Sequence, residues 1–259
     1  MKIIKTQAKE IYTKSKLPGC DYVLNQYVSC QHACTYCYAK FICRWKKYGK
    51  FGTWVEAKIN APELVKTKTV KGEVFMSSMS DPYQAIEKEL KLTRQILENI
   101  DKSTKLSILT KSDLVLRDID LFKKFKNIEV GFTINDFSGK TKDLMEPFAP
   151  DYKLRIEALK KLHEEGIKTY VFVSPIVPNL IDLKKVIDST KAYANHYWFE
   201  FMNLRGAGSE FVEMMEREYK DSLKILQDKK LMAEFVNDCT NIIHKSKVKY
   251  AGIEQHDKK

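Results

Sequence analysis

The sequence predicts an α/β protein in which an all-parallel sheet is flanked by helices and followed by a helical C-terminal extension. Two observations favour this fold class. Short runs of β-branched and aromatic residues alternate repeatedly with segments of helical periodicity, and this alternation is typical of parallel sheets. A chain of 259 residues with 44% hydrophobic residues is also long enough to bury the core of one large domain.

The first 20 residues are basic and mixed in character, and they end near a Pro18-Gly19 turn. Residues 21–28 are rich in β-branched and aromatic side chains and predict the first strand. This strand leads into a cysteine-rich loop, after which residues 38–45 have helix-compatible spacing. We therefore expect the cysteines on a loop between a first strand and a first helix.

Five further strands follow, each bounded by turn residues or by a helical segment. They are expected at residues 73–78, 105–110, 128–134, 169–174 and 197–202. The intervening helices are expected at residues 87–99, 114–125, 152–165 and 183–193. Gly166 is the expected terminator of the third of these helices. Six strands are too few for a closed eight-stranded barrel.

The chain becomes polar and helical after Gly206-Ala207-Gly208, with helices expected at residues 211–227 and 231–244. We therefore divide it into a basic N-terminal segment (1–20), a central α/β region (21–206) and a helical extension (207–259).

Composition and charge limit the class of protein. No apolar run approaches the twenty residues that a membrane span needs, and the first residues do not form a signal peptide. We expect a soluble protein of the reducing cytoplasm with no membrane partner. Residues 1–72 carry 14 Lys/Arg against 4 Asp/Glu, so nearly all of the net charge of +11 lies there. Such a region fits either nucleic acid binding or a merely solvated lysine-rich surface.

Cys30, Cys34 and Cys37 form a CxxxCxxC motif with Tyr36 just before the last cysteine. Three thiolates at this spacing can bind three irons of a [4Fe–4S] cluster and leave the fourth iron open for a substrate or cosubstrate. A structural zinc site completed by His32 or Cys43 is the alternative, although the chain has no second CxxC pair. A disulfide framework is disfavoured because six cysteines in 259 residues are sparse.

Polar side chains follow every predicted strand. In parallel α/β barrels the reacting groups collect at the carboxyl ends of the strands. Here these ends carry the cysteine loop and five polar segments, at residues 77–81, 110–112, 133–136, 174–175 and 200–205. The sequence therefore predicts one site at this end of the sheet.

The cysteine motif resembles that of the radical S-adenosylmethionine (SAM) superfamily. Five later segments are similar, in the same order, to its spore photoproduct lyase-like branch: Ser80-Asp81-Pro82-Tyr83, Phe132 to Asn135, Glu146-Pro147, Arg155 to Leu159 and Ser174-Pro175-Ile176. The resemblance implies an incomplete (β/α)6 TIM-type barrel that binds a [4Fe–4S] cluster and SAM. It implies reductive cleavage of SAM to a 5′-deoxyadenosyl radical, hydrogen abstraction from a substrate, and a low-potential electron donor such as ferredoxin or flavodoxin.

The resemblance also assigns roles around the cysteine loop. Cys30, Cys34 and Cys37 would bind the cluster. Tyr36 would pack by the adenine of SAM, or would only anchor its loop. The segment from Ser78 to Asp81 would receive the SAM amino group, because a carboxylate accepts hydrogen bonds from an ammonium. Asp81 equally suits an Asx turn before Pro82.

Further SAM contacts are implied at the later strand ends. Lys111 resembles a lysine that reaches SAM in this branch, and Thr133 and Asn135 resemble ribose-contacting residues. Pro175 would shape the adenine pocket. Arg155 would meet the methionine carboxylate of SAM, or would form a salt bridge on a helix surface. Glu200, Asn203 and Arg205 lie where the substrate or the ribose is expected, and no catalytic residue is assigned.

The sequence departs from the photoproduct lyases at Ser78, where those enzymes carry a cysteine that returns a hydrogen atom to the product radical. A serine O–H bond is too strong to do so readily, so repair of thymine dimers by that mechanism is not expected. Cys20, Cys43 and Cys239 would substitute only if folded into the site. The leading hypothesis is a radical SAM enzyme with an unidentified substrate, nucleic acid being one candidate. The alternative is a non-catalytic, zinc-stabilised nucleic-acid-binding protein.

Overall fold

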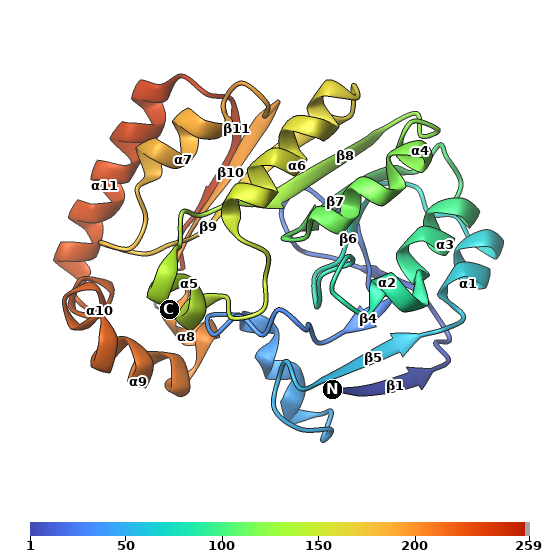
Figure 1. The fold of residues 1–259 in the computed structure, drawn as a ribbon, viewed down its shortest axis with the longest axis horizontal. Coiled ribbons are helices and arrows are strands. Elements are labelled where there is room, and N and C mark those ends of the chain that lie inside the picture. The colour runs from blue at the N-terminus through green and yellow to red at the C-terminus, as the bar shows by residue number, and fades with distance from the viewer. Residues whose placement is uncertain (257–259) are drawn as a thin grey trace.

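The structure is a computed structural model that describes residues 1–256. Its main sheet has eight strands in the order β11-β10-β9-β8-β7-β6-β3-β2, and neighbouring strands from β3 to β11 are parallel (Figure 1). The six predicted strands are all present: β3 (Tyr22–Leu24), β6 (Glu73–Met76), β7 (Lys105–Thr110), β8 (Ile128–Thr133), β9 (Lys168–Ile176) and β10 (His196–Phe201). The predicted parallel α/β architecture is therefore confirmed.

Five strands were not expected. They are β1 (Lys2–Thr6), β2 (Tyr12–Lys14), β4 (Tyr27–Val28), β5 (Trp54–Lys58) and β11 (Tyr250–Glu254). Strands β1, β5 and β4 form a second, three-stranded sheet, while β2 pairs antiparallel with β3 at one edge of the main sheet. The predicted first strand thus divides, because β3 ends at Leu24 and the chain crosses to the small sheet. The divisions proposed at residues 20 and 206 remain predictions.

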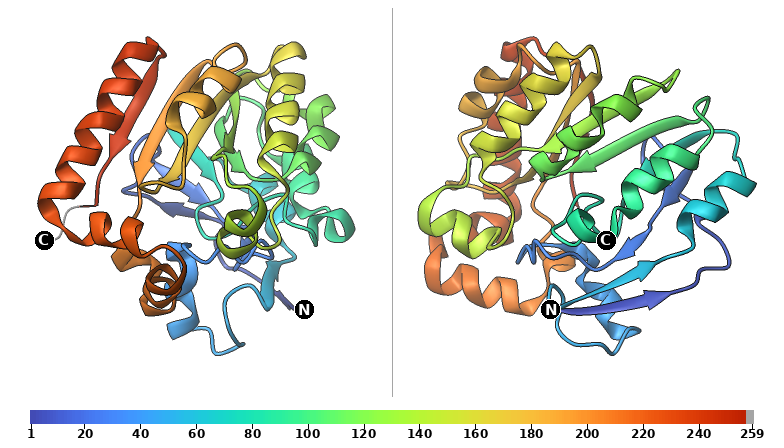
Figure 2. Two further views of the ribbon diagram at one scale, coloured as in Figure 1. Left: turned by 60° about the vertical axis from the view of Figure 1, so that its left-hand side comes forward. Right: turned by 45° about the vertical axis from the view of Figure 1, so that its right-hand side comes forward.

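Helices cover the outside of the main sheet and one end of it (Figures 1 and 2). They are α1 (Ala61–Thr67), α2 (Glu87–Leu90), α3 (Leu92–Asn99), α4 (Ile119–Phe122), α5 (Gly139–Met145), α6 (Tyr152–Glu164), α7 (Leu183–Thr190), α8 (Leu204–Ala207), α9 (Ser209–Glu218), α10 (Lys220–Gln227) and α11 (Lys229–Ser246), with 3₁₀ helices η1 (Tyr38–Arg44) and η2 (Asp113–Asp118). The helical extension is present, but it ends in β11, which adds a seventh parallel strand beside β10.

The predicted helix at residues 87–99 breaks at Lys91, whose φ of 52° is left-handed. The Glu87 carboxylate stabilises the broken conformation. It accepts hydrogen bonds from the backbone N–H groups of Thr93 (3.0 Å) and Arg94 (3.4 Å) and so caps the N-terminus of α3. The predicted helix at residues 114–125 likewise divides into η2 and α4.

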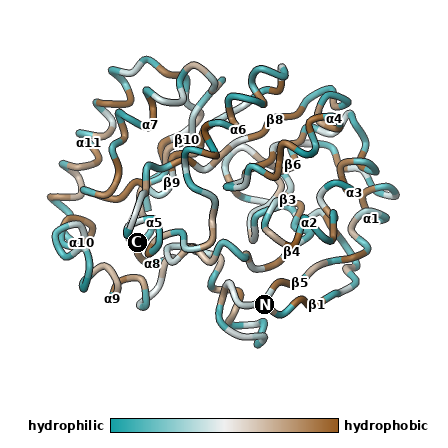
Figure 3. The backbone as a smooth tube through the Cα atoms, in the orientation of Figure 1, coloured by the Kyte–Doolittle hydropathy of each residue, from teal (hydrophilic) through white to brown (hydrophobic). Residues whose placement is uncertain are grey.

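The core lies between the sheet and its helices. Side chains alternate along each strand, so Val171 and Val173 of β9 pack outward with Leu159 and Leu162 of α6, all fully buried. Burying each such side chain contributes about 1.5–3 kcal/mol. Figure 3 shows this pattern as hydrophobic strands between helices of mixed hydropathy. The other face of the strands is free to line an interior cavity.

Candidate functional site

One cavity of about 850 Å³ follows the inner face of the main sheet. Its lining begins at the first residues of strands, such as Lys105 and Lys168, and reaches their carboxyl ends at Lys111 and Ser174. The interior of a closed barrel is normally filled by side chains. The open sheet here instead leaves room for ligands along its whole length.

All three cysteines of the CxxxCxxC motif line this cavity. Two successive turns shape their loop, with hydrogen bonds from Ala33 N–H to Cys30 O and from Cys37 N–H to Cys34 O, both 3.2 Å. Ala33 has a left-handed φ of 51°. Gly52 packs directly against it, because a Cβ atom on Gly52 would lie only 2.4 Å from the Ala33 Cβ. Glycine is therefore required behind the loop.

The three thiols need a bound cation to become good ligands. Burial raises the pKa of Cys30 well above its usual value, raises the pKa of Cys34 to about 12, and raises the pKa of Cys37. Iron would hold them as thiolates. Within residues 1–256, no three His, Cys, Asp or Glu side chains are grouped for a single metal ion. Three thiolates are enough to bind three irons of a cluster, whereas a structural zinc site needs a fourth ligand.

The cysteine loop is anchored on the side of α5. Thr35 donates its N–H to Met145 O (3.0 Å) and its hydroxyl to Leu144 O (2.9 Å). The neighbouring Tyr36 hydroxyl donates to the Glu146 carboxylate, while the Tyr36 ring lines the cavity. Tyr36 is therefore a loop anchor that also presents an aromatic face to the cavity.

Glu146 is a fully buried carboxylate behind the cavity wall. It accepts hydrogen bonds from Tyr36, from the Asn135 amide (3.1 Å) and from the Arg155 guanidinium. Burial alone would raise the pKa of Glu146, but the charges of Arg155 and Lys111 and the hydrogen bonds from Arg155 and Tyr36 lower it to about 2. Glu146 is thus a charged hub that joins three predicted site residues.

Arg155, which was expected to meet the methionine carboxylate of SAM or to form a salt bridge on a helix surface, lies in the protein interior. Arg155 is fully buried and lies outside the cavity lining. Its Nε and Nη2 donate to Pro150 O at 3.0 and 2.7 Å, its Nη1 donates to Thr133 O at 3.0 Å, and Nη2 also pairs with Glu146. Each guanidinium nitrogen is therefore engaged by protein groups, and no nitrogen is turned toward a ligand.

Asn135 also lies behind the wall rather than in the lining. Its amide nitrogen donates to Glu146 and to Ser174 O (3.4 Å), whereas its Oδ1 has no hydrogen-bond partner among the described residues. A buried acceptor without a partner is costly, so Oδ1 is a point where a bound group or a water molecule would gain a contact.

The remaining predicted SAM-contact residues all line the cavity: Tyr36, Ser78, Asp81, Lys111, Thr133 and Pro175. The Asp81 carboxylate accepts hydrogen bonds from Tyr83 N–H (2.8 Å), the Thr110 hydroxyl (2.6 Å) and Lys111 N–H (2.7 Å). The first of these is the Asx turn before Pro82. Asp81 therefore ties two strand ends together and still faces the cavity.

Lys111 and Ser78 are held in different ways. The Lys111 ammonium lies 5.7 Å from the centre of the Tyr36 ring. Burial lowers its pKa, but the nearby Cys34 and Glu146 charges outweigh burial, so the pKa of Lys111 is raised. Ser78 is positioned by Asn25, whose Oδ1 accepts its backbone N–H at 2.8 Å. Each side chain is thus presented to the cavity by a neighbour of complementary chemistry.

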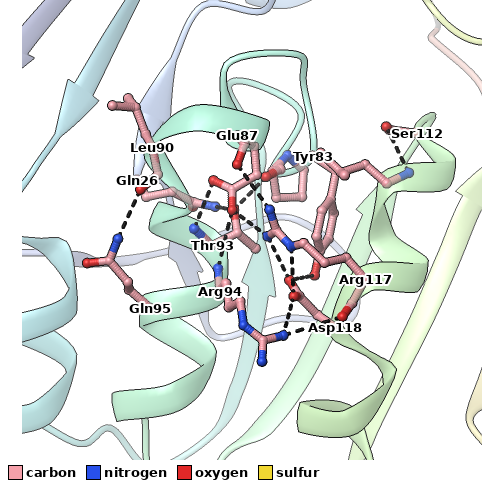
Figure 4. A network of polar contacts seen from close by, with 12 residues as sticks. Gln26, Tyr83, Glu87, Leu90, Thr93, Arg94, Gln95, Ser112, Arg117 and Asp118 are labelled. Atoms are coloured by element: carbon pink, nitrogen blue, oxygen red, sulfur yellow. Dashed lines mark hydrogen bonds and ion pairs between the residues drawn. The ribbon is translucent and has the colours of Figure 1, made fainter.

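A buried polar network supports the loop that carries Ser78 and Asp81 (Figure 4). Glu87 accepts hydrogen bonds from the Tyr27 hydroxyl (2.6 Å) and Arg117 (2.7 Å). Asp118 accepts from the Tyr83 hydroxyl (3.1 Å) and from Arg117 (2.9 Å). The charges are paired, so the network stabilises α2, η2 and the Asp81 turn as one unit.

The family described as Radical SAM superfamily matches residues 24–189, well over half of the chain and the whole of the cysteine loop. The chain belongs to the radical SAM superfamily. It is accordingly a radical SAM enzyme, and membership of this superfamily implies SAM and an iron–sulfur cluster as cofactors and the need for a reductant.

Relatives span nearly the whole chain. An uncharacterized protein of Methanocaldococcus jannaschii is 52% identical over 256 residues, covering 99% of this chain and 98% of the relative. An uncharacterized protein of Acidianus two-tailed virus is 31% identical over 246 residues, covering 86% of this chain and 79% of the relative. Neither relative has a stated reaction.

The fold is similar to that of a solved spore photoproduct lyase complexed with dinucleoside spore photoproduct. The TM-score is 0.67 at 15% identity, over 96% of this chain and 81% of that chain. This likeness shows a shared fold, which confirms the predicted incomplete barrel and, at the level of the fold, the predicted resemblance to spore photoproduct lyase. Within residues 1–256, no helix has the length and apolar character needed to cross a membrane.

Sequence reasoning missed part of the radical SAM cavity. Glu200 was expected near a ligand without a role, and it accepts hydrogen bonds from the Ser174 hydroxyl (2.5 Å) and pairs with His256 Nε2 (3.1 Å). The hydrogen bond to Glu200 raises the pKa of His256. His256 and Glu254 reach the cavity because β11 adds to the sheet. No strand was predicted at residues 250–254, so these two cavity residues were missed.

Some of the other candidate residues line the cavity and others do not. Asn203 lines the cavity while capping α8 through Gly206 N–H (2.8 Å), whereas Arg205 is exposed on α8. Cys20 lines the opposite end of the cavity from the cysteine motif, near the start of β3. Cys43 and Cys239 lie outside the cavity.

Proposed function

We propose that Cys30, Cys34 and Cys37 bind a [4Fe–4S] cluster with SAM at its open iron, and that the cavity beneath it holds the substrate. The observation that carries this proposal is the convergence of three free cysteines and six predicted SAM-contact residues on one 850 Å³ cavity. When bound, the cluster and SAM supply a 5′-deoxyadenosyl radical that abstracts hydrogen from the substrate.

The chain's own residues would bind and orient SAM. Lys111 is a half-buried cation in the cavity lining and is suited to the SAM carboxylate. Asp81 and the Ser78 segment offer acceptors for the amino group, and Thr133 and Pro175 border the ribose and adenine. The Tyr36 ring offers a flat apolar contact.

Arg155 and Glu146 act as positioning residues in this proposal. Their buried ion pair fixes the Tyr36 hydroxyl, the Asn135 amide and the Thr133 carbonyl in one arrangement. The unpartnered Oδ1 of Asn135 leaves an acceptor for a ribose hydroxyl or a bridging water.

The test is anaerobic reconstitution with iron and sulfide, followed by reduction with dithionite and addition of SAM. We expect 5′-deoxyadenosine from the unmodified protein and from Cys239→Ala, because Cys239 is a buried thiol of α11 outside the cavity. We expect none from Cys34→Ala. Product that is equal in the two variants, or a protein that takes up one zinc ion and no cluster, would refute the assignment.

The substrate is proposed only at the level of its chemical class. The basic excess in residues 1–72 supports a nucleic acid substrate as the second candidate. Binding that weakens steeply between low and moderate salt would support it, and absence of binding at low salt would remove it. Ser78 in place of the hydrogen-donating cysteine argues against photoproduct repair. We further propose a reducing cytoplasmic setting, which the six free thiols fit.

A further inference from the structure

The surface of η1 and the loop after it is strongly basic. Residues 38–52 contain Lys40, Arg44, Lys46, Lys47 and Lys50 and no acidic residue. The helix begins immediately after Cys37, which occupies its N-cap position. This basic surface is therefore covalently continuous with the third cysteine of the motif.

Only some of these cations are engaged inside the protein. The Lys40 ammonium donates to Thr35 O and Ala207 O, and Lys46 pairs with the buried Glu56 at 2.7 Å. Arg44 and Lys47 are exposed and have no acidic partner within residues 1–256. They are available to a partner outside the chain.

A neighbouring helix extends the same basic surface. Helix α8 packs against η1 and carries the exposed Arg205. Lys50 lies 3.8 Å from Glu210, but both side chains are largely exposed and this pair is weak. We call Arg44, Lys47, Lys50 and Arg205, together with Phe41 and Trp45, the η1 patch.

The apolar part of the η1 patch is compact. The Phe41 and Trp45 rings contact edge to face with centroids 5.5 Å apart, and Tyr38 stacks on Phe41 at 6.3 Å. Trp45 is 68% exposed, which is high for a tryptophan. An exposed aromatic centre beside free cations is typical of a docking surface.

Access to the cysteines limits which surface an electron donor can use. Cys30 and Cys34 are buried, and the cavity that they line is the place proposed for SAM and substrate. A protein donor must therefore approach from outside the barrel. No residue of the η1 patch lines that cavity, and η1 itself begins immediately after Cys37.

We propose that the η1 patch is the docking surface for an acidic one-electron carrier protein. The inference rests on the proposed iron–sulfur function. One electron passes from the reduced carrier to the cluster, so the carrier is oxidised by one electron and the cluster is reduced by one, with no bond broken. Electron-transfer interfaces are small and transient, and opposite charges steer their encounter. One short helix with a basic rim meets these requirements.

The patch fits a single-stranded nucleic acid less well. Sequence-independent binding of single strands uses separate aromatic faces on which successive bases stack. Here the rings of Tyr38, Phe41 and Trp45 pack on one another, so they do not offer separate faces on which bases could stack. The patch residues also lie outside the cavity rather than along it.

The test compares two reductants on the reconstituted protein. The variants are Arg44→Glu/Lys47→Glu in the η1 patch and Lys153→Glu/Lys161→Glu, a control with the same change of charge on the exposed face of α6. Cluster bleaching and 5′-deoxyadenosine formation are followed with a reduced, strongly acidic flavodoxin and, separately, with dithionite.

We expect the patch variant to be reduced about tenfold more slowly by flavodoxin at low salt, with the difference shrinking at high salt. The rate at which dithionite reduces the patch variant should stay within about twofold of the rate for the unmodified protein. The control variant should match the unmodified protein with both reductants. Trp45→Ala should also slow the reduction of the cluster by flavodoxin, without slowing its reduction by dithionite.

Three outcomes would overturn the inference. They are equal flavodoxin rates in the patch and control variants, a matching loss with dithionite, and loss of single-stranded oligonucleotide binding with unchanged flavodoxin rates. Failure of the proposed function is distinct, because the unmodified protein would then take up no cluster or give no 5′-deoxyadenosine even with dithionite.

Discussion

At the scale of single residues, the buried pair of Arg155 and Glu146 is the most sensitive point of the site. We expect Arg155→Leu to lower the free energy of unfolding by about 3–5 kcal/mol, because it leaves Glu146 buried without its counter-charge. Chemical denaturation of the apoprotein measures this. The stability of Arg155→Lys should lie between those of the unmodified protein and Arg155→Leu. Lysine keeps the positive charge, but its ammonium cannot reach Pro150 O, Thr133 O and Glu146 together.

The double variant Arg155→Leu/Glu146→Leu is the control for this prediction. It removes both charges and should regain part of the lost stability. A loss below about 1 kcal/mol for Arg155→Leu, or a double variant less stable than the sum of the single changes, would contradict the assigned role.

Glu146 also predicts how stability changes with pH. Its folded-state pKa, about 2, is depressed below the usual value of 4.5. Its contribution is therefore fully present above about pH 4.5 and is lost as pH falls toward 2, amounting to about 3 kcal/mol. We expect Glu146→Gln to flatten this part of the stability curve. An unchanged slope between pH 4.5 and 2 in the variant would show that other carboxylates dominate.

The sequence predicted which residue types gather at the strand ends, but not which ones face the cavity. The cysteines, Asp81 and Lys111 follow strands directly, so their positions follow from topology. Arg155 lies on α6, and its burial depends on Pro150 and Thr133 carbonyls that meet it only in the folded chain. No local pattern distinguishes such an arginine from one on a helix surface.

At the scale of elements, the break between α2 and α3 can be tested directly. Lys91 is exposed with a φ of 52° and a ψ of 29°, a region that costs a residue with a Cβ atom about 1–2 kcal/mol. We expect Lys91→Gly to stabilise the protein by about 0.5–1 kcal/mol after the greater freedom of the unfolded chain is included. Thermal and chemical denaturation measure the change.

The matched control is Lys88→Gly within α2, which should destabilise the protein by about 1 kcal/mol. If both glycines destabilised the protein equally, the chain would be continuing as one helix through Lys91. Helical periodicity predicts such a continuous helix, because the apolar spacing persists across residues 87–99. The break depends instead on the Glu87 side chain, whose capping of α3 has no periodic signature.

At the scale of the whole molecule, β11 is one of the five strands that the sequence did not reveal. This strand has only five residues, Tyr250–Glu254, and one of them is Gly252. Glycine weakens the sequence pattern of a strand. The structure shows why glycine is there. A Cβ atom on Gly252 would lie 2.4 Å from the Trp198 ring of the neighbouring strand, and that ring lines the cavity.

We therefore expect Gly252→Val to displace Trp198, to change its fluorescence, and to destabilise the protein by about 1–3 kcal/mol through overpacking. Ala251→Val is the control for stability and for Trp198 fluorescence, since Ala251 is exposed on the same strand and valine favours strands. Ala251 also lines the cavity, so this variant is not a control for SAM cleavage. Equal behaviour of the two variants would mean that β11 does not pack on Trp198. Because β11 also carries Glu254 and His256 into the cavity, a shift of this strand should change uncoupled SAM cleavage as well, which links the last strand of the chain to the chemistry at the first loop.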